Sequence, residues 1–185
     1  PVFQRPDEYG TLTHWLAVVA YTVQLYGDFS GYTDMGRGSA KLMGFDLPIN
    51  FNFPYIAFSP RDYWRRNHIT LTTWLRDYLF FSLERDNHQN RRIITMRNVM
   101  ITFFLGGLWH GARWTFAAWG LFHGVWLCLH HVYRNWLERR GPPPAWINGL
   151  SYRCMSRVCT FILLVTSLVL FRSQSMDQAW LILKS

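Results

Sequence analysis

Two long runs without a formally charged side chain lie next to each other in the second half of the chain. The first extends from residue 98 to residue 112 and the second from 114 to 133, and Arg113 alone separates them. A connection this short makes two adjoining helices an antiparallel hairpin. Because uncharged runs of this kind are typical of segments in bilayer hydrocarbon, we expect a membrane-embedded hairpin.

His110 lies near the end of the first run, in the stretch Gly106-Gly107-Leu108-Trp109-His110-Gly111. An ionisable side chain in or near hydrocarbon is costly and therefore points to a function. Imidazole is also the side chain best suited to move a proton near neutral pH. We therefore expect intramembrane proton-transfer chemistry at His110.

The composition supports a membrane protein with basic connecting segments. Half of the residues are hydrophobic and 18% are aromatic, and 19 Lys and Arg against 11 Asp and Glu give a net charge of +8. Trp and Tyr favour membrane interfaces, and basic loops favour the cytoplasmic face of a bilayer. A nucleic-acid partner also suits a basic surface. The basic residues here lie between apolar runs, not along one stripe, so we expect a bilayer and no nucleic acid.

Shorter apolar segments flank the hairpin. As a helix, the run 14–27 spans about 21 Å, less than the roughly 30 Å hydrocarbon core. It therefore borrows length from its neighbours or enters the bilayer as a re-entrant segment. Residues 28–40 begin with Asp28 and continue to the small residues Gly36, Gly38, Ser39 and Ala40, and they suit a helix-packing surface or a ligand site. The run 158–171 is also short for a span unless the flanking arginines snorkel.

Residues 61–81 have the pattern of an amphipathic helix at the membrane interface. Ser59-Pro60 is a plausible start for this helix. One face of the helical wheel is mainly apolar and carries Trp64, His68, Leu71, Leu75, Tyr78 and Leu79. The other carries Arg65, Arg66, Thr72, Thr73 and Arg76. The pattern predicts that His68 points inward, and we expect the basic segments 85–97 and 134–157 to form cytoplasmic loops.

His68 and His110 are the strongest candidates for a catalytic role among the seven histidines. The neighbouring groups that could orient the two rings are Asn67, Arg76 and Asp77 for His68, and Trp109 for His110. His123, in the middle of its run, is either a hydrogen-bonded core histidine or a partner of the site.

Other chemistries have little support in the sequence. The spacing of His123, His130 and His131 does not reproduce the His-x-x-His-His pairs of membrane di-iron enzymes, and no Asp or Glu lies in the hairpin runs to balance a metal charge. We expect no metal. A Gly-x-Ser-x-Gly hydrolase elbow is absent, and the three cysteines form neither a zinc motif nor a disulfide framework.

The chain resembles the membrane-bound O-acyltransferase (MBOAT) family, and the resemblance runs in order from about Tyr26 to the C-terminus. The branch it resembles most is that of the bacterial alginate O-acetylation proteins. The matching motifs are Asp28-Phe29-Ser30-Gly31-Tyr32, Phe51-Asn52-Phe53-Pro54-Tyr55, Tyr63-Trp64-Arg65-Arg66-Asn67-His68-Ile69-Thr70-Leu71, Trp74-Leu75-Arg76-Asp77-Tyr78, Gly106-Gly107-Leu108-Trp109-His110-Gly111, Trp119-Gly120-Leu121-Phe122-His123-Gly124 and Phe171-Arg172-Ser173. Family members often have Trp or Phe where this chain has Asn67.

The resemblance implies a fold and a place in a longer protein. Residues 1–185 would be one partial MBOAT domain that lacks the N-terminal helices and the final helix. The expected fold is all-α, a multi-helix integral membrane bundle with an interfacial amphipathic helix, re-entrant segments and a tunnel. The expected location is the bacterial inner membrane, as a multi-pass protein.

The resemblance also implies a site and a reaction. His110 would be the catalytic histidine and His68 the second polar residue facing the tunnel, with Trp109, Asn67, Asp77, Arg76, Asp28 and His123 as candidate lining residues. Transfer of an acyl group from a thioester to a hydroxyl needs a base for the hydroxyl proton. A dry pocket would hold His110 neutral and able to accept it.

We therefore expect an O-acetyltransferase that acts on an exported polysaccharide such as alginate. No cofactor is expected to stay bound, and the acyl donor would be acetyl-CoA or another acyl thioester, held through its phosphates by basic residues. Periplasmic acetyl-accepting proteins and the polysaccharide are the expected partners. The alternatives are a non-catalytic lipid or polysaccharide transporter and a D-alanyl- or phospholipid-directed acyltransferase of the same family.

Overall fold

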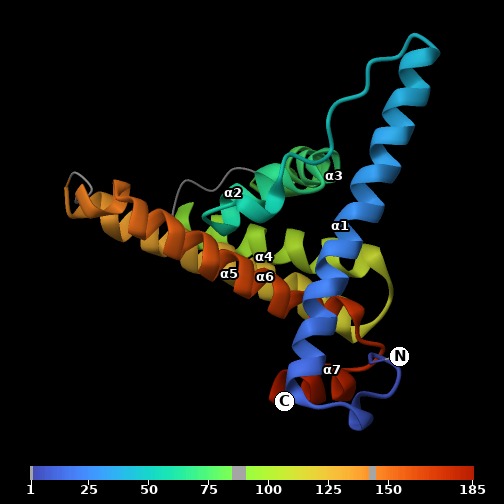
Figure 1. The fold of residues 1–185 in the computed structure, drawn as a ribbon. Helices are drawn as coiled ribbons and strands as arrows, with labels where there is room; N and C mark the ends of the chain where they lie inside the picture. The colour runs from blue at the N-terminus through green and yellow to red at the C-terminus, as the bar shows by residue number, and fades with distance from the viewer. Residues whose placement is uncertain (1, 85–90, 142–144) are drawn as a thin grey trace.

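The computed structural model describes residues 2–84, 91–141 and 145–185 (Figure 1). All regular structure in these ranges is helical, which confirms the all-α fold class. The α-helices are α1 (Thr11–Leu42), α2 (Pro60–Arg66), α3 (Ile69–Trp74), α4 (Arg91–His110), α5 (Trp114–Arg139), α6 (Leu150–Arg172) and α7 (Met176–Lys184). The shorter turns are η1 (Pro6–Glu8), η2 (Pro54–Ile56), the π-helix η3 (Leu75–Phe80), η4 (Ser82–Glu84) and η5 (Ala145–Asn148).

Helices α4 and α5 form the expected hairpin and pack along each other. Two glycines make their close approach possible. A Cβ atom on Gly120 would lie 2.2 Å from the carbonyl oxygen of Phe103, and one on Gly107 would lie 2.3 Å from that of Phe116. Small residues of this kind let helix backbones pack closely. The crossing fixes where the end of α4, and with it His110, meets α5.

The helices extend further than the uncharged runs predict. Residues 91–97, expected in a polar loop, form the first turns of α4, and residues 85–90 of that loop lie outside the described residues. In the same way 134–139 belong to α5, and 150–157 belong to α6. The basic side chains of these segments therefore lie on helix ends, where they do not interrupt the backbone hydrogen bonds.

Helix α6 is long enough to cross a bilayer. Its 23 residues span about 34 Å at 1.5 Å per residue, against roughly 30 Å of hydrocarbon. Among the described helices it alone meets the length and composition expected of a membrane span. The apolar run 158–171 alone is short for a span, and the helix reaches spanning length because it begins several residues earlier, at Leu150.

Helix α1 is a single helix of 32 residues, although the sequence suggested a shorter segment. Its first half packs against α6 and α7, where a buried apolar cluster forms from Val18, Val165, Val169, Ala179 and Ile182. Its second half projects away from the other helices, and the chain returns from its far end to α2 (Figure 1). Residues 43–59 make this return and bring Phe51 and Tyr55 beside Tyr26 of α1.

The start of the predicted amphipathic helix is confirmed. Pro60 is the first residue of α2, and the hydroxyl of Ser59 accepts a hydrogen bond of 3.1 Å from the backbone N–H of Asp62. This is a helix N-cap, which satisfies a donor that the first turn leaves free. Proline suits the first helical position because it has no N–H to satisfy.

The prediction of one continuous helix over 61–81 is wrong. The helix ends at Arg66, a new one begins at Ile69, and η3 follows it. His68 lies at the break with φ 46° and ψ 52°, a left-handed conformation that is uncommon for a non-glycine residue. A pattern of apolar residues does not reveal such a break, because contacts with residues far along the chain hold it in place.

Candidate functional site

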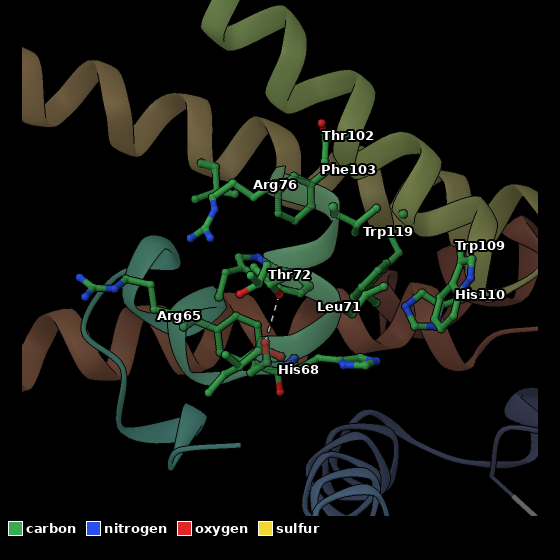
Figure 2. Close-up of a pocket in the computed structure, with 18 of the residues that line it drawn as sticks. Arg65, His68, Leu71, Thr72, Arg76, Thr102, Phe103, Trp109, His110 and Trp119 are labelled. Carbon is green, nitrogen blue, oxygen red and sulfur yellow. Dashed lines mark hydrogen bonds between the residues drawn. The ribbon is translucent and has the colours of Figure 1, made fainter. Parts of the chain in front are cut away.

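A cavity of about 980 Å³ lies between the α2–η3 segment and helices α1, α4, α5 and α6. Most of its wall is aromatic or aliphatic. Its arginines and histidines are Arg61, Arg65, Arg76, His68 and His110, and the one amide side chain among the described lining residues is Asn67. No described residue that lines it is acidic. Figure 2 shows Arg65 and Arg76 on one side of the drawn group and Trp109 with His110 on the other.

His110 is the last residue of α4 and faces the cavity. Aromatic rings surround it, with centroids 5.0 Å away for Trp109, 5.3 Å for Trp119 and 5.1 Å for Phe171. Within the described parts of the chain its ring makes no hydrogen bond, to a backbone carbonyl or to any other group. Both ring nitrogens are therefore free to meet a ligand.

His68 also lines the cavity, but its ring is held on one side. Its Nδ1 lies 3.3 Å from Oδ1 of Asn50, a buried residue of the returning segment. The ring of Phe29 from α1 packs edge-on against it at 4.8 Å between centroids. The left-handed backbone at His68 directs this side chain into the cavity from the break between α2 and α3.

The two histidines are close enough to influence each other. Burial and, as a smaller effect, the positive charge that His110 can carry lower the pKa of His68 to about 4. His68 lies in the segment expected at the membrane interface, outside the helices expected to span. A proton on either ring therefore disfavours a proton on the other, and the resting form of His68 near neutral pH is uncharged.

The predicted lining residues divide into two groups. Trp109, Asn67 and Arg76 line the cavity together with the two histidines. Asp28 is exposed on α1 and does not line it. Asp77 is also outside the lining, and its carboxylate accepts two hydrogen bonds from Arg76, of 2.7 and 3.2 Å. Its contribution is therefore to fix the guanidinium of Arg76.

His123 is a buried core histidine behind the cavity wall. Its Nε2 lies 3.1 Å from the hydroxyl of Ser167, which itself donates to the backbone carbonyl of Leu164. The ring packs against Trp64 and Trp119, at 5.0 and 4.9 Å between centroids, and both indoles line the cavity. Of the two roles the sequence left open, the structure shows the hydrogen-bonded core histidine, which supports the wall from behind.

The break at His68 rearranges the two faces of the predicted amphipathic helix. Arg65, Thr72, Thr73 and Arg76, which share the polar face of an unbroken wheel, all line the cavity. Tyr78, from the opposite face, is exposed. Arg65 and Arg76 thus line the same cavity as the histidines, whereas Arg66 pairs with Asp62 at 2.8 Å. Arg65 has no carboxylate partner among the described residues, so it carries an uncompensated positive charge there.

Asn50 is a site residue that sequence reasoning missed. The sequence places it in an irregular, proline-containing segment with no periodic pattern to mark it. Its contact with His68 joins residues 18 positions apart and depends on the fold of the whole segment. No group of three or more His, Cys, Asp or Glu suited to a metal ion occurs within the described ranges.

Comparison with known proteins identifies relatives of this chain. The model of the family described as "MBOAT, membrane-bound O-acyltransferase family" matches residues 4–171. The "Probable alginate O-acetylase AlgI" of Azotobacter vinelandii is 45% identical over 166 residues, which are 90% of this chain and 31% of the relative. The "Peptidoglycan O-acetyltransferase" of Helicobacter pylori is 35% identical over 182 residues, 98% of this chain and 33% of the relative.

A third relative carries a different acyl group in its name. The "Teichoic acid D-alanyltransferase" of Bacillus subtilis is 32% identical over 133 residues, 69% of this chain and 34% of the relative. The chain thus spans about a third of the length of each of these proteins. The family match covers the whole cavity, from α1 to Phe171. The chain belongs to the membrane-bound O-acyltransferase family.

Proposed function

We propose that this chain is part of a multi-pass O-acetyltransferase of the bacterial inner membrane, which acetylates hydroxyl groups of an exported polysaccharide such as alginate. One observation carries the proposal. Two histidines from separate segments face a single aromatic cavity that also holds three arginines and no carboxylate among its described lining residues. Relatives named for alginate and peptidoglycan O-acetylation support the choice of acyl group and acceptor.

His110 acts as the general base. Its neutral ring takes the proton of the acceptor hydroxyl while the hydroxyl oxygen attacks the carbonyl carbon of the thioester. The tetrahedral intermediate then breaks its C–S bond, and the imidazolium returns the proton to the leaving thiolate. The acyl group has moved from sulfur to oxygen, and the proton has moved from oxygen to sulfur. The free ring nitrogens of His110 suit both proton transfers.

The aromatic wall keeps water away from this reaction. Trp119, Phe171 and Trp109 each lie within 5.3 Å of the His110 ring, measured between centroids. Water at this place would hydrolyse the activated acyl group, and its absence also strengthens the electrostatic interactions of the site. The buried contact of His123 with Trp119 holds part of this wall in position.

The acyl donor is acetyl-CoA or another acyl thioester. Arg61, Arg65 and Arg76 line the cavity, and guanidinium groups bind phosphate oxygens through paired hydrogen bonds. In Figure 2, Arg65 and Arg76 lie on one side of the drawn residues and His110 lies on the other. A donor with a phosphate-bearing end and a reactive thioester end suits this separation. No bound cofactor takes part in this scheme.

The surrounding bilayer completes the proposed arrangement. The α2–η3 segment lies at the cytoplasmic interface, α4, α5 and α6 belong to a multi-helix bundle, and α1 is either a span or a re-entrant segment of it. The acetyl group leaves on the other side, to periplasmic acetyl-accepting proteins or to the polysaccharide itself. A D-alanyl transfer by the same histidines is the second candidate, favoured by the similarity to the teichoic acid D-alanyltransferase.

The experiment that tests the function measures the acetyl content of the polysaccharide in cells with the full-length protein. His110→Ala and His110→Gln are both expected to lower transfer by about 10²- to 10⁴-fold, because neither can take up the proton. His131→Gln is the matched control, since His131 bonds Asn135 on α5 and lies outside the cavity lining. All variants are compared at equal membrane protein levels.

The outcomes separate the candidate functions. Near-normal acetylation in His110→Gln would contradict the general-base role. A wild-type protein that moves lipid or polysaccharide but transfers no acyl group would be a transporter. Incorporation of labelled D-alanine in place of acetate would favour the second candidate.

A further inference from the structure

Asn50 makes four contacts that stabilise the break between α2 and α3. Its backbone carbonyl accepts a hydrogen bond of 2.9 Å from the N–H of Ile69. Its side-chain Oδ1 lies 3.1 Å from the backbone nitrogen of Thr70, 2.9 Å from the Thr70 hydroxyl and 3.3 Å from Nδ1 of His68. The residue is buried, so these contacts replace contacts with water.

The Thr70 contact settles which side-chain atom of Asn50 faces His68. A backbone N–H is always a donor, so the atom it meets must be the amide oxygen and not the amide nitrogen. An amide oxygen accepts hydrogen bonds and never donates them. The ring nitrogen of His68 that points to the same oxygen must therefore carry a hydrogen and donate it.

We propose that Asn50 is a positioning residue of the acyltransfer site, which fixes His68 as the Nδ1–H tautomer and leaves Nε2 as its one lone pair for a ligand. In a neutral imidazole one nitrogen donates and the other accepts. Because Nδ1 donates to Asn50, Nε2 can accept a hydrogen bond in the cavity that His68 lines. The donor of that hydrogen bond would be the substrate hydroxyl or the arm that carries the thioester. This inference rests on the proposed function, since it assigns a role within the same site.

Among the residues that the structure describes, Asn50 is the one hydrogen-bond partner of the His68 ring. The rings that face it are Phe29 from α1, Phe51 from the returning segment and Trp109 from α4. Among the described titratable groups, His110 on α4 is the one whose charge acts on it. Phe29 and Phe51 offer no hydrogen bond. The tautomer of His68 therefore depends on Asn50.

The direct test is a nitrogen-15 NMR spectrum of the full-length protein labelled at histidine, in lipid at pH 7. The His68 signals are those lost in His68→Gln. A protonated Nδ1 and an unprotonated Nε2 are expected, and Asn50→Ala should abolish this preference. Asn52→Ala is the matched control, because Asn52 is an exposed neighbour outside the cavity lining. The opposite tautomer in the wild-type protein would overturn the proposal.

Kinetics test whether the contact serves the reaction. At equal protein level, Asn50→Ala is expected to lower acyl transfer at least tenfold, with no further loss when it is added to His68→Gln. Asn50→Asp keeps the acceptor oxygen and should restore most activity, but its negative charge favours imidazolium and should move the acidic limb of the rate profile to higher pH.

Three kinetic results would overturn the proposal. The first is a loss in the double variant that equals the product of the two single losses, which is what a purely structural role predicts. The second is an Asn50→Asp profile that coincides with the wild type. The third is a wild-type rate in His68→Gln, because Asn50 would then position no useful group. Failure of the general-base role is separate, since it is measured with His110→Gln and leaves the tautomer of His68 unchanged.

Discussion

The indole of Trp109 contacts both cavity histidines, with its ring centroid 6.4 Å from that of His68 and 5.0 Å from that of His110. The first histidine belongs to the break before α3 and the second to the end of α4, so this one side chain couples two segments that are far apart in sequence. Both contacts are edge-on, an arrangement that aromatic rings favour. Trp109 therefore limits how each imidazole can turn.

Trp109→Ala is expected to lower acyl transfer by about 10- to 100-fold, because small losses of alignment at reacting groups are costly. Trp109→Phe keeps an aromatic edge for both rings and should lose much less. Rates are measured with the full-length protein in membranes at equal protein level. Trp180→Ala is the control, since Trp180 is similarly exposed on α7 but lies outside the cavity lining. Equal activity of Trp109→Ala and the control would contradict the coupling role.

The pH dependence of stability should carry a signature of His68. Its pKa is lowered by burial to about 4 in the folded protein, against 6.5 for a free imidazole. Protons therefore bind the unfolded state more readily than the folded state. The contribution of neutral His68 to the free energy of unfolding is complete above about pH 6.5 and is lost as the pH falls from there through 4.

The measurement is the melting temperature in detergent between pH 4 and 7.5. The decline toward low pH should be shallower in His68→Gln than in the wild type, because the variant has no imidazole to protonate at this place. His131→Gln, for which the same decline as in the wild type is expected, is the control. Parallel curves for His68→Gln and the wild type would show that His68 is not held neutral by the fold.

Gly120→Ala tests the crossing of α4 and α5. The new Cβ would lie 2.2 Å from the carbonyl oxygen of Phe103, which as a backbone atom cannot turn aside. We expect a destabilisation of about 1–3 kcal/mol and a loss of transfer, because the end of α4 with His110 would shift. Thermal denaturation of the purified protein measures the first effect. Gly27→Ala, with no described atom within 4 Å of its Cβ, should cause no destabilisation and leave transfer unchanged.

The hairpin and the cavity histidines could be predicted from the sequence because local patterns encode them. Uncharged runs mark the cores of α4 and α5, and the short link at Arg113 dictates their antiparallel packing. The position of His110 near the end of the first uncharged run predicts a place near a helix end, and His110 is the last residue of α4. Helix ends were less predictable, since α6 begins at Leu150 and includes basic residues that an apolar count excludes.

The break at His68 could not be predicted, and neither could the role of Asn50. A helical wheel assumes unbroken α-helical dihedrals, whereas His68 adopts a positive φ that long-range hydrogen bonds to Asn50 stabilise. The same assumption placed Arg65 opposite the site, although the break brings it to the cavity wall. Asp28 was a candidate because of its motif, but α1 carries it on an exposed face.

Arg65→Ala is expected to raise KM for the acyl-CoA donor about tenfold with kcat nearly unchanged, because it removes a charged hydrogen-bond donor for phosphate, worth about 1.5 kcal/mol. Initial rates of acyl transfer in proteoliposomes at low salt give both constants, and added salt should narrow the difference. Arg134→Ala is the control, since Arg134 pairs with Glu138 at 3.4 Å and lies outside the cavity lining. An unchanged KM in Arg65→Ala would place the donor phosphates elsewhere, away from the wall that Arg65 shares with His68 and His110.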